Sequence, residues 1–383
     1  MLYRKFGKTN EEVSVLGFGC MRLPIIDGDP THIDEDKAIT MMRYAIDAGV
    51  NYVDTAYPYH GTGFTKGGES EPFVAKALKD GYRDRVKLAT KLPSWLIKTR
   101  SDMDKYLNEQ LERLETDKID FYLVHSLNKG VWTTLKEADF GGFLDQAIKD
   151  GRIGYAGFSF HDEVALFKEI VDYYDWSFCQ IQYNYLDENY QAGKEGLEYA
   201  AKKGLGIAIM EPLRGGNLIR LPEKAQDVLI DSEVRRTPAE LALRWVMNHP
   251  EVSVVLSGMS TMDHVIENVK VASQAAPNSL TSNEIAVVDE VKRLFKERIK
   301  VNCTACSYCM PCPAGINIPN IFGNYNDYWV FDRSPEAQRR YGIISKLAAP
   351  ASKCIECAKC ESHCPQGIGI REELKNVKAL FEE

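Results

Sequence analysis

Eight short apolar runs alternate with amphipathic stretches in the first 272 residues, and this alternation limits the possible folds more than any other feature. The apolar runs cover residues 15–20, 52–55, 86–91, 119–125, 155–159, 178–183, 206–211 and 252–257. Helical periodicity lies between them, at residues 36–48, 71–79, 102–115, 143–150, 163–172, 194–203 and 239–248. Near-continuous apolar runs are typical of strands that are buried on both faces. The sequence therefore predicts the α/β class and a closed (β/α)₈ TIM barrel.

A doubly wound open sheet is the alternative, because alternation alone does not show that a sheet closes on itself. Sheets of that kind that bind dinucleotides carry the fingerprint G-x-G-x-x-G directly after a strand. No such fingerprint follows any of the eight apolar runs, which weakens this alternative.

Eight of the ten cysteines lie in two short runs near the C-terminus. The runs are Cys303-x2-Cys306-x2-Cys309-x2-Cys312-Pro and Cys354-x2-Cys357-x2-Cys360-x3-Cys364-Pro. Three cysteines at C-x2-C-x2-C spacing ligate one [4Fe–4S] cluster, and a fourth cysteine before proline ligates a second one. Two clusters with crossed ligand sets are therefore expected. The sets are Cys303, Cys306, Cys309 and Cys364 for one cluster, and Cys354, Cys357, Cys360 and Cys312 for the other.

Zinc is the alternative metal for these cysteines. Cys₄ zinc sites use two C-x2–4-C pairs that a longer loop separates, whereas each run here has three intervals in series and ends in Cys-Pro. The first run departs from the usual bacterial ferredoxin pattern, because two residues rather than three precede Cys312. The remaining cysteines, Cys20 and Cys179, lie within apolar runs and are expected to be core residues.

A domain boundary is predicted near residue 283. Residues 273–283 (SQAAPNSLTSN) have the composition of a linker. Thr281 and Glu284 then form a capping box, which opens a helix that leads into the first cysteine run. We predict a barrel domain over residues 1–283 and a small, mainly α-helical, ferredoxin-like iron–sulfur domain over residues 284–383.

The net charge of −8 argues against nucleic acid or an anionic membrane surface as a partner. No apolar stretch approaches the roughly 20 residues that span a bilayer, and the N-terminus lacks the apolar segment of a signal peptide. A cytoplasmic location is expected. In a reducing cytosol, clustered cysteines indicate metal or redox chemistry rather than disulfides.

Polar side chains stand at the ends of three predicted strands, where barrel enzymes place their catalytic groups. Asp54 ends the second apolar run, Lys91 the third and His125 the fourth. Tyr59 follows Asp54 by five residues, in the sequence NYVDTAYPY. These four side chains are expected to converge at one mouth of the barrel.

An ordered set of further motifs accompanies these four residues. It comprises Gly7-Lys8-Thr9, residues 16–19 (LGFG), residues 151–159 (GRIGYAGFS), residues 180–183 (QIQY) and residues 211–216 (EPLRGG). With the Asp, Tyr, Lys and His tetrad, residues 1–272 resemble the aldo-keto reductase superfamily. The whole chain is similar to the branch of that superfamily with a fused C-terminal two-cluster [4Fe–4S] helical ferredoxin-type domain.

The resemblance implies NAD(P)H-linked reduction of a small carbonyl compound, or oxidation of an alcohol. Tyr59 would be the general acid, and its pKa would have to be lowered because a free phenol is a weak acid. Lys91 would favour the phenolate, and Asp54 would keep Lys91 charged. A neutral His125 would hydrogen bond to the carbonyl oxygen and orient the substrate.

The resemblance also implies which residues bind the nicotinamide cofactor. Ser159 and Gln180 would hold its carboxamide, Met210 would lie under its ring, and the loop with Leu213, Arg214 and Gly216 would approach the pyrophosphate. Glu267 and Asn268 match the adenine contacts. The family's Lys and Arg for the 2′-phosphate of NADP align with Gly258 and His264, and its Asn after Ser159 is Phe160. We therefore expect a weakened preference for NADP(H), although the choice between NADH and NADPH is not readable from the sequence.

Two functional hypotheses remain at this point. In the first, the clusters connect an aldo-keto reductase to a one-electron carrier such as a ferredoxin. In the second, the protein is an electron-transfer or redox-sensing module, and its barrel binds a nucleotide without turnover. The intact tetrad favours the first hypothesis. The loop of residues 61–70 (GTGFTKGGES) is expected to shape the substrate pocket or to be a plain flexible loop. The substrate, the cluster potentials, any flavin and the oligomeric state are not readable from the sequence.

Overall fold

The computed structural model describes residues 1–303, 305 and 307–383. It contains two compact units. The first unit joins Met1–Leu218 with Thr237–Ser282, and the second joins Ile219–Arg236 with Asn283–Glu383. Residues 219–236 therefore belong to the second unit although they lie within the first 283 residues of the chain. The boundary that the sequence suggested at residue 283 stays a prediction.

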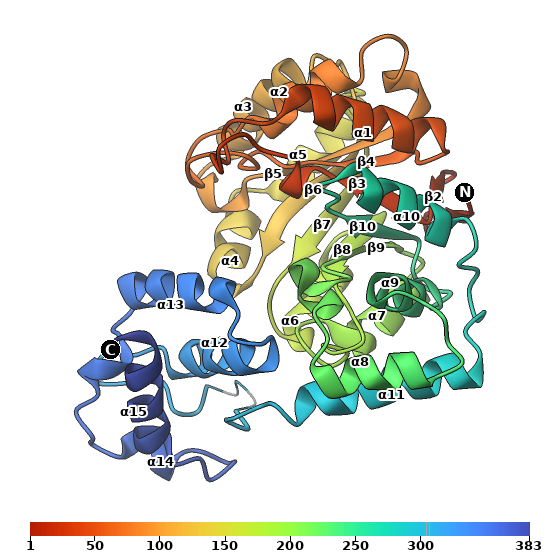
Figure 1. Ribbon diagram of the computed structural model, residues 1–383. Helices are drawn as coiled ribbons and strands as arrows, with labels where there is room; N and C mark the ends of the chain where they lie inside the picture. Colours follow the sequence, from red (N-terminus) through yellow and green to blue (C-terminus); the bar gives the residue numbers. More distant parts are fainter. Residues whose placement is uncertain (304, 306) are drawn as a thin grey trace. The chain divides into compact units, whose positions relative to one another are not determined.

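Eight parallel strands form a closed barrel in the first unit (Figure 1), which confirms the predicted fold and excludes the open sheet. Around the barrel the order is β10-β3-β4-β5-β6-β7-β8-β9. The strands are β3 (Leu16–Gly19), β4 (Tyr52–Asp54), β5 (Lys87–Leu92), β6 (Ile119–Leu127), β7 (Ile153–Phe160), β8 (Phe178–Gln182), β9 (Gly206–Met210) and β10 (Val254–Ser257).

Helices of the first unit surround the barrel in Figure 1. They are α1 (Glu35–Asp47), α2 (Ser70–Ala77), α3 (Arg100–Arg113), α4 (Lys129–Glu137), α5 (Phe140–Lys149), α6 (Val164–Tyr173), α7 (Gly193–Lys202), α9 (Pro238–Met247) and α10 (Met262–Ala272). All seven helices predicted between the apolar runs are present, with ends shifted by one to three residues. The sequence reading missed α4 and α10.

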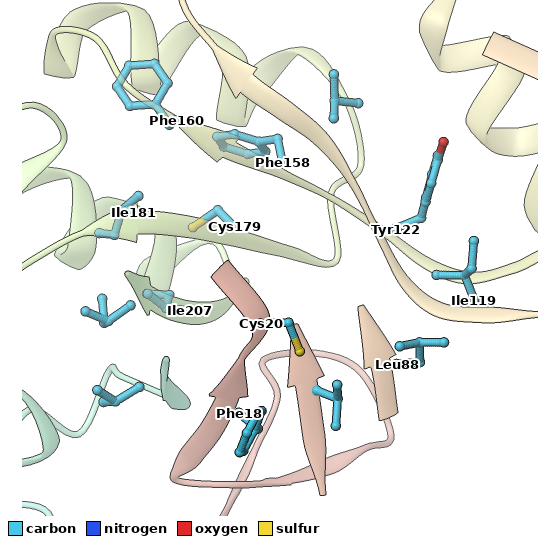
Figure 2. Close-up of a cluster of buried hydrophobic side chains, with 14 of the residues drawn as sticks. Phe18, Cys20, Leu88, Ile119, Tyr122, Phe158, Phe160, Cys179, Ile181 and Ile207 are labelled. Atoms are coloured by element: carbon cyan, nitrogen blue, oxygen red, sulfur yellow. The ribbon is translucent and has the colours of Figure 1, made fainter. Parts of the chain in front are cut away.

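The strands are mainly apolar because most of them contribute side chains to two separate cores. One core fills the barrel interior, and the other lies between strands and helices. Figure 2 shows part of the outer core, in which Cys20 and Cys179 are fully buried, as predicted. Packing on both faces explains why the sequence shows no alternation of apolar and polar residues along these strands.

A short antiparallel hairpin, β1 (Tyr3–Lys5) and β2 (Glu12–Ser14), precedes the barrel and was not predicted. Phe6 follows β1 and packs in the interior core against the rings of Tyr52 and Phe121. A Cβ atom on Gly206 would lie 2.5 Å from the Phe6 ring, so this position needs glycine. The hairpin thus delivers an aromatic side chain that fills the barrel interior.

The second unit is mainly helical, as predicted. Its helices are α8 (Glu223–Asp231), α11 (Ser282–Lys296), α12 (Ile318–Val330), α13 (Pro335–Leu347), α14 (Lys359–Ser362) and α15 (Ile370–Phe381). A core that includes Ile321, Phe322, Tyr341 and Leu374 joins α12, α13 and α15. Throughout the described residues, no helix is both long and apolar enough to cross a membrane.

Candidate active site and cluster-binding loops

The strand ends bring three of the four predicted catalytic side chains into direct contact. Lys91 Nζ, on β5, lies 2.7 and 2.8 Å from the two carboxylate oxygens of Asp54 at the end of β4. It also donates to the Thr55 carbonyl oxygen at 2.7 Å and lies 3.5 Å from the Tyr59 hydroxyl. The His125 ring, on β6, lies edge to face with the Tyr59 ring at 6.2 Å between centroids.

The position of Tyr59 depends on the loop that follows it. The Tyr59 carbonyl accepts a hydrogen bond from Ser70 N at 3.2 Å, and Tyr57 O accepts one from Gly68 N at 2.8 Å. A Cβ atom on Gly68 would lie 2.1 Å from the Tyr59 carbonyl oxygen, so only glycine permits this approach. Arg113 of α3 donates to Gly68 O and fixes the same loop from the outside. Residues 61–70 are therefore tied to the backbone of Tyr59.

Lys91 and Asp54 form a buried ion pair, with side-chain exposures of 0% and 4%. Burial acts to lower the pKa of Lys91, but Asp54 and Tyr59 outweigh it, so that the pKa is raised above its usual value. Burial raises the pKa of the Asp54 carboxyl against the opposing effect of Lys91. Each charge of the pair depends on the other, since neither is solvated by water.

The direction of the Tyr59 pKa shift differs from the sequence-based expectation. Lys91 does act to lower it, but burial has the larger effect, and the pKa of Tyr59 is raised. The expectation failed because it counted the nearby cation and not the cost of placing a phenolate in a buried site. Tyr59 is therefore a protonated phenol at neutral pH, which is the form that can donate a proton.

His125 is neutral at this site. Burial, and then the charges of Lys91 and His161, lower its pKa well below the usual value. Its Nδ1 atom is buried and has no hydrogen-bond partner in the described part of the chain. A buried polar atom without a partner is costly, so this imidazole has hydrogen-bonding capacity that a bound molecule can use.

An aromatic series that the sequence reading missed continues from His125 to the surface. The ring of Trp95 lies 5.2 Å from that of His125, and the ring of Phe64 lies 6.1 Å from that of Trp95. Trp95 Nε1 donates to the Phe64 carbonyl oxygen at 2.8 Å, although 72% of Phe64 is exposed. The loop of residues 61–70 therefore borders the same mouth as His125.

The predicted carboxamide-binding residues lie side by side on neighbouring strands. Ser159 on β7 pairs in register with Gln180 on β8, and both are buried. Ser159 Oγ accepts a hydrogen bond from Ser126 N at 2.7 Å, and Gln180 Nε2 lies 3.7 Å from Met210 Sδ. Gln180 Oε1 is buried and lacks a partner within the described residues. The donor groups of a carboxamide fit this unsatisfied oxygen.

The predicted pyrophosphate loop has an unusual backbone. Arg214, Gly215 and Gly216 have φ angles of 49°, 67° and 91°, a left-handed run in which glycine is favoured. Arg214 is paired with Asp187 at 3.1 Å. Leu213 is half-buried. The Arg22 guanidinium, which the sequence reading missed, approaches Gly215 and lies 2.8 Å from where a Cβ atom would be.

The remaining predicted nucleotide contacts lie around α10. Gly258 follows β10, and the Arg22 side chain packs against it, 3.1 Å from an added Cβ atom. His264 is exposed, with Nδ1 at 3.5 Å from Ser260 Oγ. Glu267 accepts a hydrogen bond from Thr237 at 2.5 Å, and the buried Asn268 donates to Ser257 Oγ at 3.0 Å. Phe160 is fully buried and packs on Phe167, so this position offers a core side chain and no polar group where the family has Asn.

Three predicted ligands of the first cluster line one apolar cavity in the second unit. Cys303 and Cys309 of the first run and Cys364 of the second border it, together with Ile318, Phe322 and Ile370. Cys306, the fourth predicted ligand, lies outside the described residues. Cysteines from both runs thus meet, which is the arrangement that crossed ligation needs.

All four predicted ligands of the second cluster are described. Cys312, Cys354 and Cys360 pack on the core of the second unit, whereas Cys357 is exposed. Burial and then Glu361 raise the pKa of the Cys360 thiol, and Cys354 adds to this rise. Among the described residues, no group of three Cys, His, Asp or Glu side chains is arranged to hold a metal ion.

Both cysteine runs share a backbone pattern. The residues on either side of the second cysteine of each run have positive φ angles. These angles are 56° for Ala305 and 61° for Ser307 in the first run, and 53° for Glu356 and 58° for Ala358 in the second. Left-handed residues are one half of the backbone nests that bind anionic groups, including iron–sulfur clusters. The backbone and the thiols fit the same kind of group.

A closed barrel with a buried lysine–aspartate pair, a tyrosine and a neutral histidine at its mouth defines a barrel oxidoreductase. The model of the aldo/keto reductase family matches residues 15–293, and the chain belongs to this family. A 4Fe-4S dicluster domain matches residues 302–368. The resemblance inferred from the motifs and the fused iron–sulfur domain are thereby confirmed.

Known proteins similar to this chain match 70–76% of its length. L-galactose dehydrogenase of Arabidopsis thaliana is 27% identical over 320 residues, which cover 76% of this chain and 95% of that protein. An uncharacterized oxidoreductase of Bacillus subtilis is 26% identical over 311 residues, 70% of this chain and 90% of that protein. The holo form of an aldo-keto reductase of Bacillus halodurans superposes with a TM-score of 0.62 at 28% identity, covering 76% of this chain and 96% of that one.

Proposed function

We propose that this protein reduces a small carbonyl compound with NAD(P)H, or oxidises the corresponding alcohol. We further propose that its iron–sulfur domain exchanges electrons with a ferredoxin-like carrier. When bound, the nicotinamide dinucleotide supplies or accepts hydride, and two [4Fe–4S] clusters carry single electrons. The contact of the Tyr59 hydroxyl with the buried Lys91–Asp54 pair is the observation that carries the proposal.

The residues of the barrel mouth have complementary roles in this proposal. The Tyr59 hydroxyl donates a proton to the substrate oxygen as negative charge develops there. Lys91 stabilises the phenolate that remains, and Asp54 keeps Lys91 charged. The neutral His125 donates a hydrogen bond that orients the carbonyl group. Ser159 and Gln180 hold the carboxamide, which the unpartnered Gln180 Oε1 supports.

Tyr59→Phe tests this function directly. Without the hydroxyl, carbonyl turnover should fall at least about 100-fold, because a positioned proton donor contributes that much or more. The measurement is NAD(P)H oxidation with a panel of aldehydes and ketones, together with the EPR signal of the clusters, which should persist.

Tyr57→Phe is the matched control. Tyr57 lies in the same turn, but its hydroxyl donates to Glu109 at 2.9 Å, away from Lys91. This change should cost about 1 kcal/mol of stability and leave turnover within a few-fold. Carbonyl turnover that is unaffected by Tyr59→Phe would contradict the proposed reductase mechanism. The absence of carbonyl turnover in the unaltered protein would favour the alternative function, a redox module whose barrel binds nucleotide without turnover.

We also propose NAD(H) as the preferred cofactor. A 2′-phosphate needs permanent positive charge, whereas Gly258 has no side chain and His264 is an imidazole. The side chain of Arg22 packs on Gly258, but its guanidinium lies at Gly215 of the predicted pyrophosphate loop. His264→Arg should therefore raise the affinity for NADPH by about tenfold and leave that for NADH nearly unchanged. Fluorescence titration of both proteins with both nucleotides measures this. Tighter binding of NADPH than of NADH by the unaltered protein would contradict the proposal.

A further inference from the structure

One predicted cluster ligand lies at the surface of the iron–sulfur domain. Of the seven described cysteines in the two runs, Cys357 is exposed and the other six are half-buried. The neighbouring Ile355 has 65% of its surface exposed. Glu356 and Ala358, which flank Cys357, both have positive φ angles, so the chain turns sharply on either side of it. A thiol and an aliphatic side chain are thereby presented to solvent.

The charges around Cys357 are unequally compensated. Glu356 pairs with Lys375 at 3.3 Å, Lys375 also lies 4.0 Å from Glu372, and Glu361 pairs with Arg371 at 2.9 Å. Lys353 and Lys359 are exposed, and no ion pair joins either one to a described residue. Two free cations therefore flank the exposed ligand, although the whole chain carries a net charge of −8.

We propose that Lys353, Ile355, Cys357 and Lys359, here termed the Cys357 edge, form the docking surface for an acidic one-electron carrier protein of the ferredoxin type. This inference rests on the proposed exchange of electrons with such a carrier. An acidic partner is repelled by the molecule as a whole, so local positive charge is needed to steer it to one place. The exposed Ile355 supplies apolar contact at the centre of that place.

The proposed reaction at the Cys357 edge is the transfer of a single electron. One electron leaves the reduced carrier and enters the cluster whose ligand set includes Cys357. The carrier is oxidised and that cluster is reduced by one electron, and the step makes or breaks no bond and moves no proton. The reverse transfer uses the same surface.

The test compares two charge reversals in the cluster-loaded, full-length protein. Lys353→Glu/Lys359→Glu places negative charge at the Cys357 edge. Lys346→Glu/Lys378→Glu makes the same net change at exposed lysines on α13 and α15. Stopped-flow mixing with a reduced, acidic bacterial ferredoxin gives the second-order rate constant at several salt concentrations. Size-exclusion chromatography and EPR after dithionite reduction check assembly and cluster content.

With the Cys357 edge reversed, the rate constant at low salt should fall at least about tenfold, and its decrease with added salt should disappear. Reversal on α13 and α15 should change the rate less than about threefold. Binding of a redox-inert, gallium-substituted ferredoxin, measured by calorimetry, should weaken in the same order. This binding readout does not depend on turnover.

Equal rate constants for the two charge-reversed proteins would overturn the docking proposal. A change of oligomeric state in the Lys353→Glu/Lys359→Glu protein alone would also overturn it, because the Cys357 edge would then be a contact between copies of this chain. A natural protein that exchanges no electrons with ferredoxin, yet reduces carbonyls with NADH, would instead refute the ferredoxin part of the proposed function. These failures are distinguishable because the second one appears before any substitution is made.

Discussion

Four histidines of this protein are buried or half-buried, and the loss of solvent around them makes the stability of the protein depend on pH. Burial lowers the pKa values of His60, His125, His161 and His249. Each one is therefore neutral in the folded chain over a pH range in which the unfolded chain binds a proton. Stability rises with pH wherever the unfolded state holds more protons, so it is lost as the pH falls below about 6.5.

His125→Asn should reduce this loss of stability. One histidine contributes at most about 1.4 kcal/mol per pH unit to the slope of the unfolding free energy. Denaturant unfolding between pH 7.5 and 5 would measure it, with His32→Asn, a change at an exposed histidine, as the control. An unchanged slope in His125→Asn would show that this imidazole is already protonated in the folded protein.

The site residues differ in how readily the sequence reveals them. Asp54, Lys91 and His125 were predictable because a strand end fixes where a side chain lies in a barrel. Trp95, Phe64 and Arg22 were not, because their proximity to the mouth depends on loop paths that follow no periodicity. The Tyr59 pKa also required the structure, since burial is not visible in a list of neighbours.

At the scale of elements, the long apolar runs predicted all eight barrel strands, because burial on both faces leaves an unambiguous pattern. The hairpin of β1 and β2 was missed since its strands have only three residues each. Helix α8 was also missed. Its place in the second unit could not be predicted, because nothing in the local sequence shows that residues 219–236 pack with residues far along the chain.

The two cysteine runs are elements whose backbone can be tested directly. Ala358 has φ 58°, a conformation that strongly disfavours β-branched side chains. Ala358→Val should therefore reduce the iron and inorganic sulfide bound per chain to less than about half, whereas Ala358→Gly should keep both. Iron and sulfide analysis of anaerobically purified protein, with EPR after reduction, is the measurement.

Ala348→Val is the matched control, because Ala348 has an extended backbone with φ −137° and ψ 179° that accepts valine. It should retain the full cluster content. Equal iron and sulfide in Ala358→Val and Ala348→Val would show that the left-handed turn after Cys357 is not needed for the clusters. Zinc without sulfide in the unaltered protein would show that the runs do not bind iron–sulfur clusters.

At the scale of the whole molecule, the path of the chain between the two units is the notable feature. Strand β9 leads into the loop of residues 211–218, and the next residues, 219–236, belong to the unit that contains both cysteine runs. The chain then returns to the first unit at Thr237. Within residues 219–236, Leu221, Ala225 and Val234 are buried, and Arg236 forms an ion pair with Glu284.

A gene fragment that stops at residue 283 would therefore not yield an intact reductase lacking its metal centres. It would retain Leu221, Ala225 and Val234 but lose Glu284 and nearly all of the unit to which residues 219–236 belong. The link between the two parts is therefore more than a single C-terminal junction, because residues 219–236 of the barrel region belong to the second unit. Biochemical dissection of this enzyme is better done by replacing single cysteines than by cutting the polypeptide.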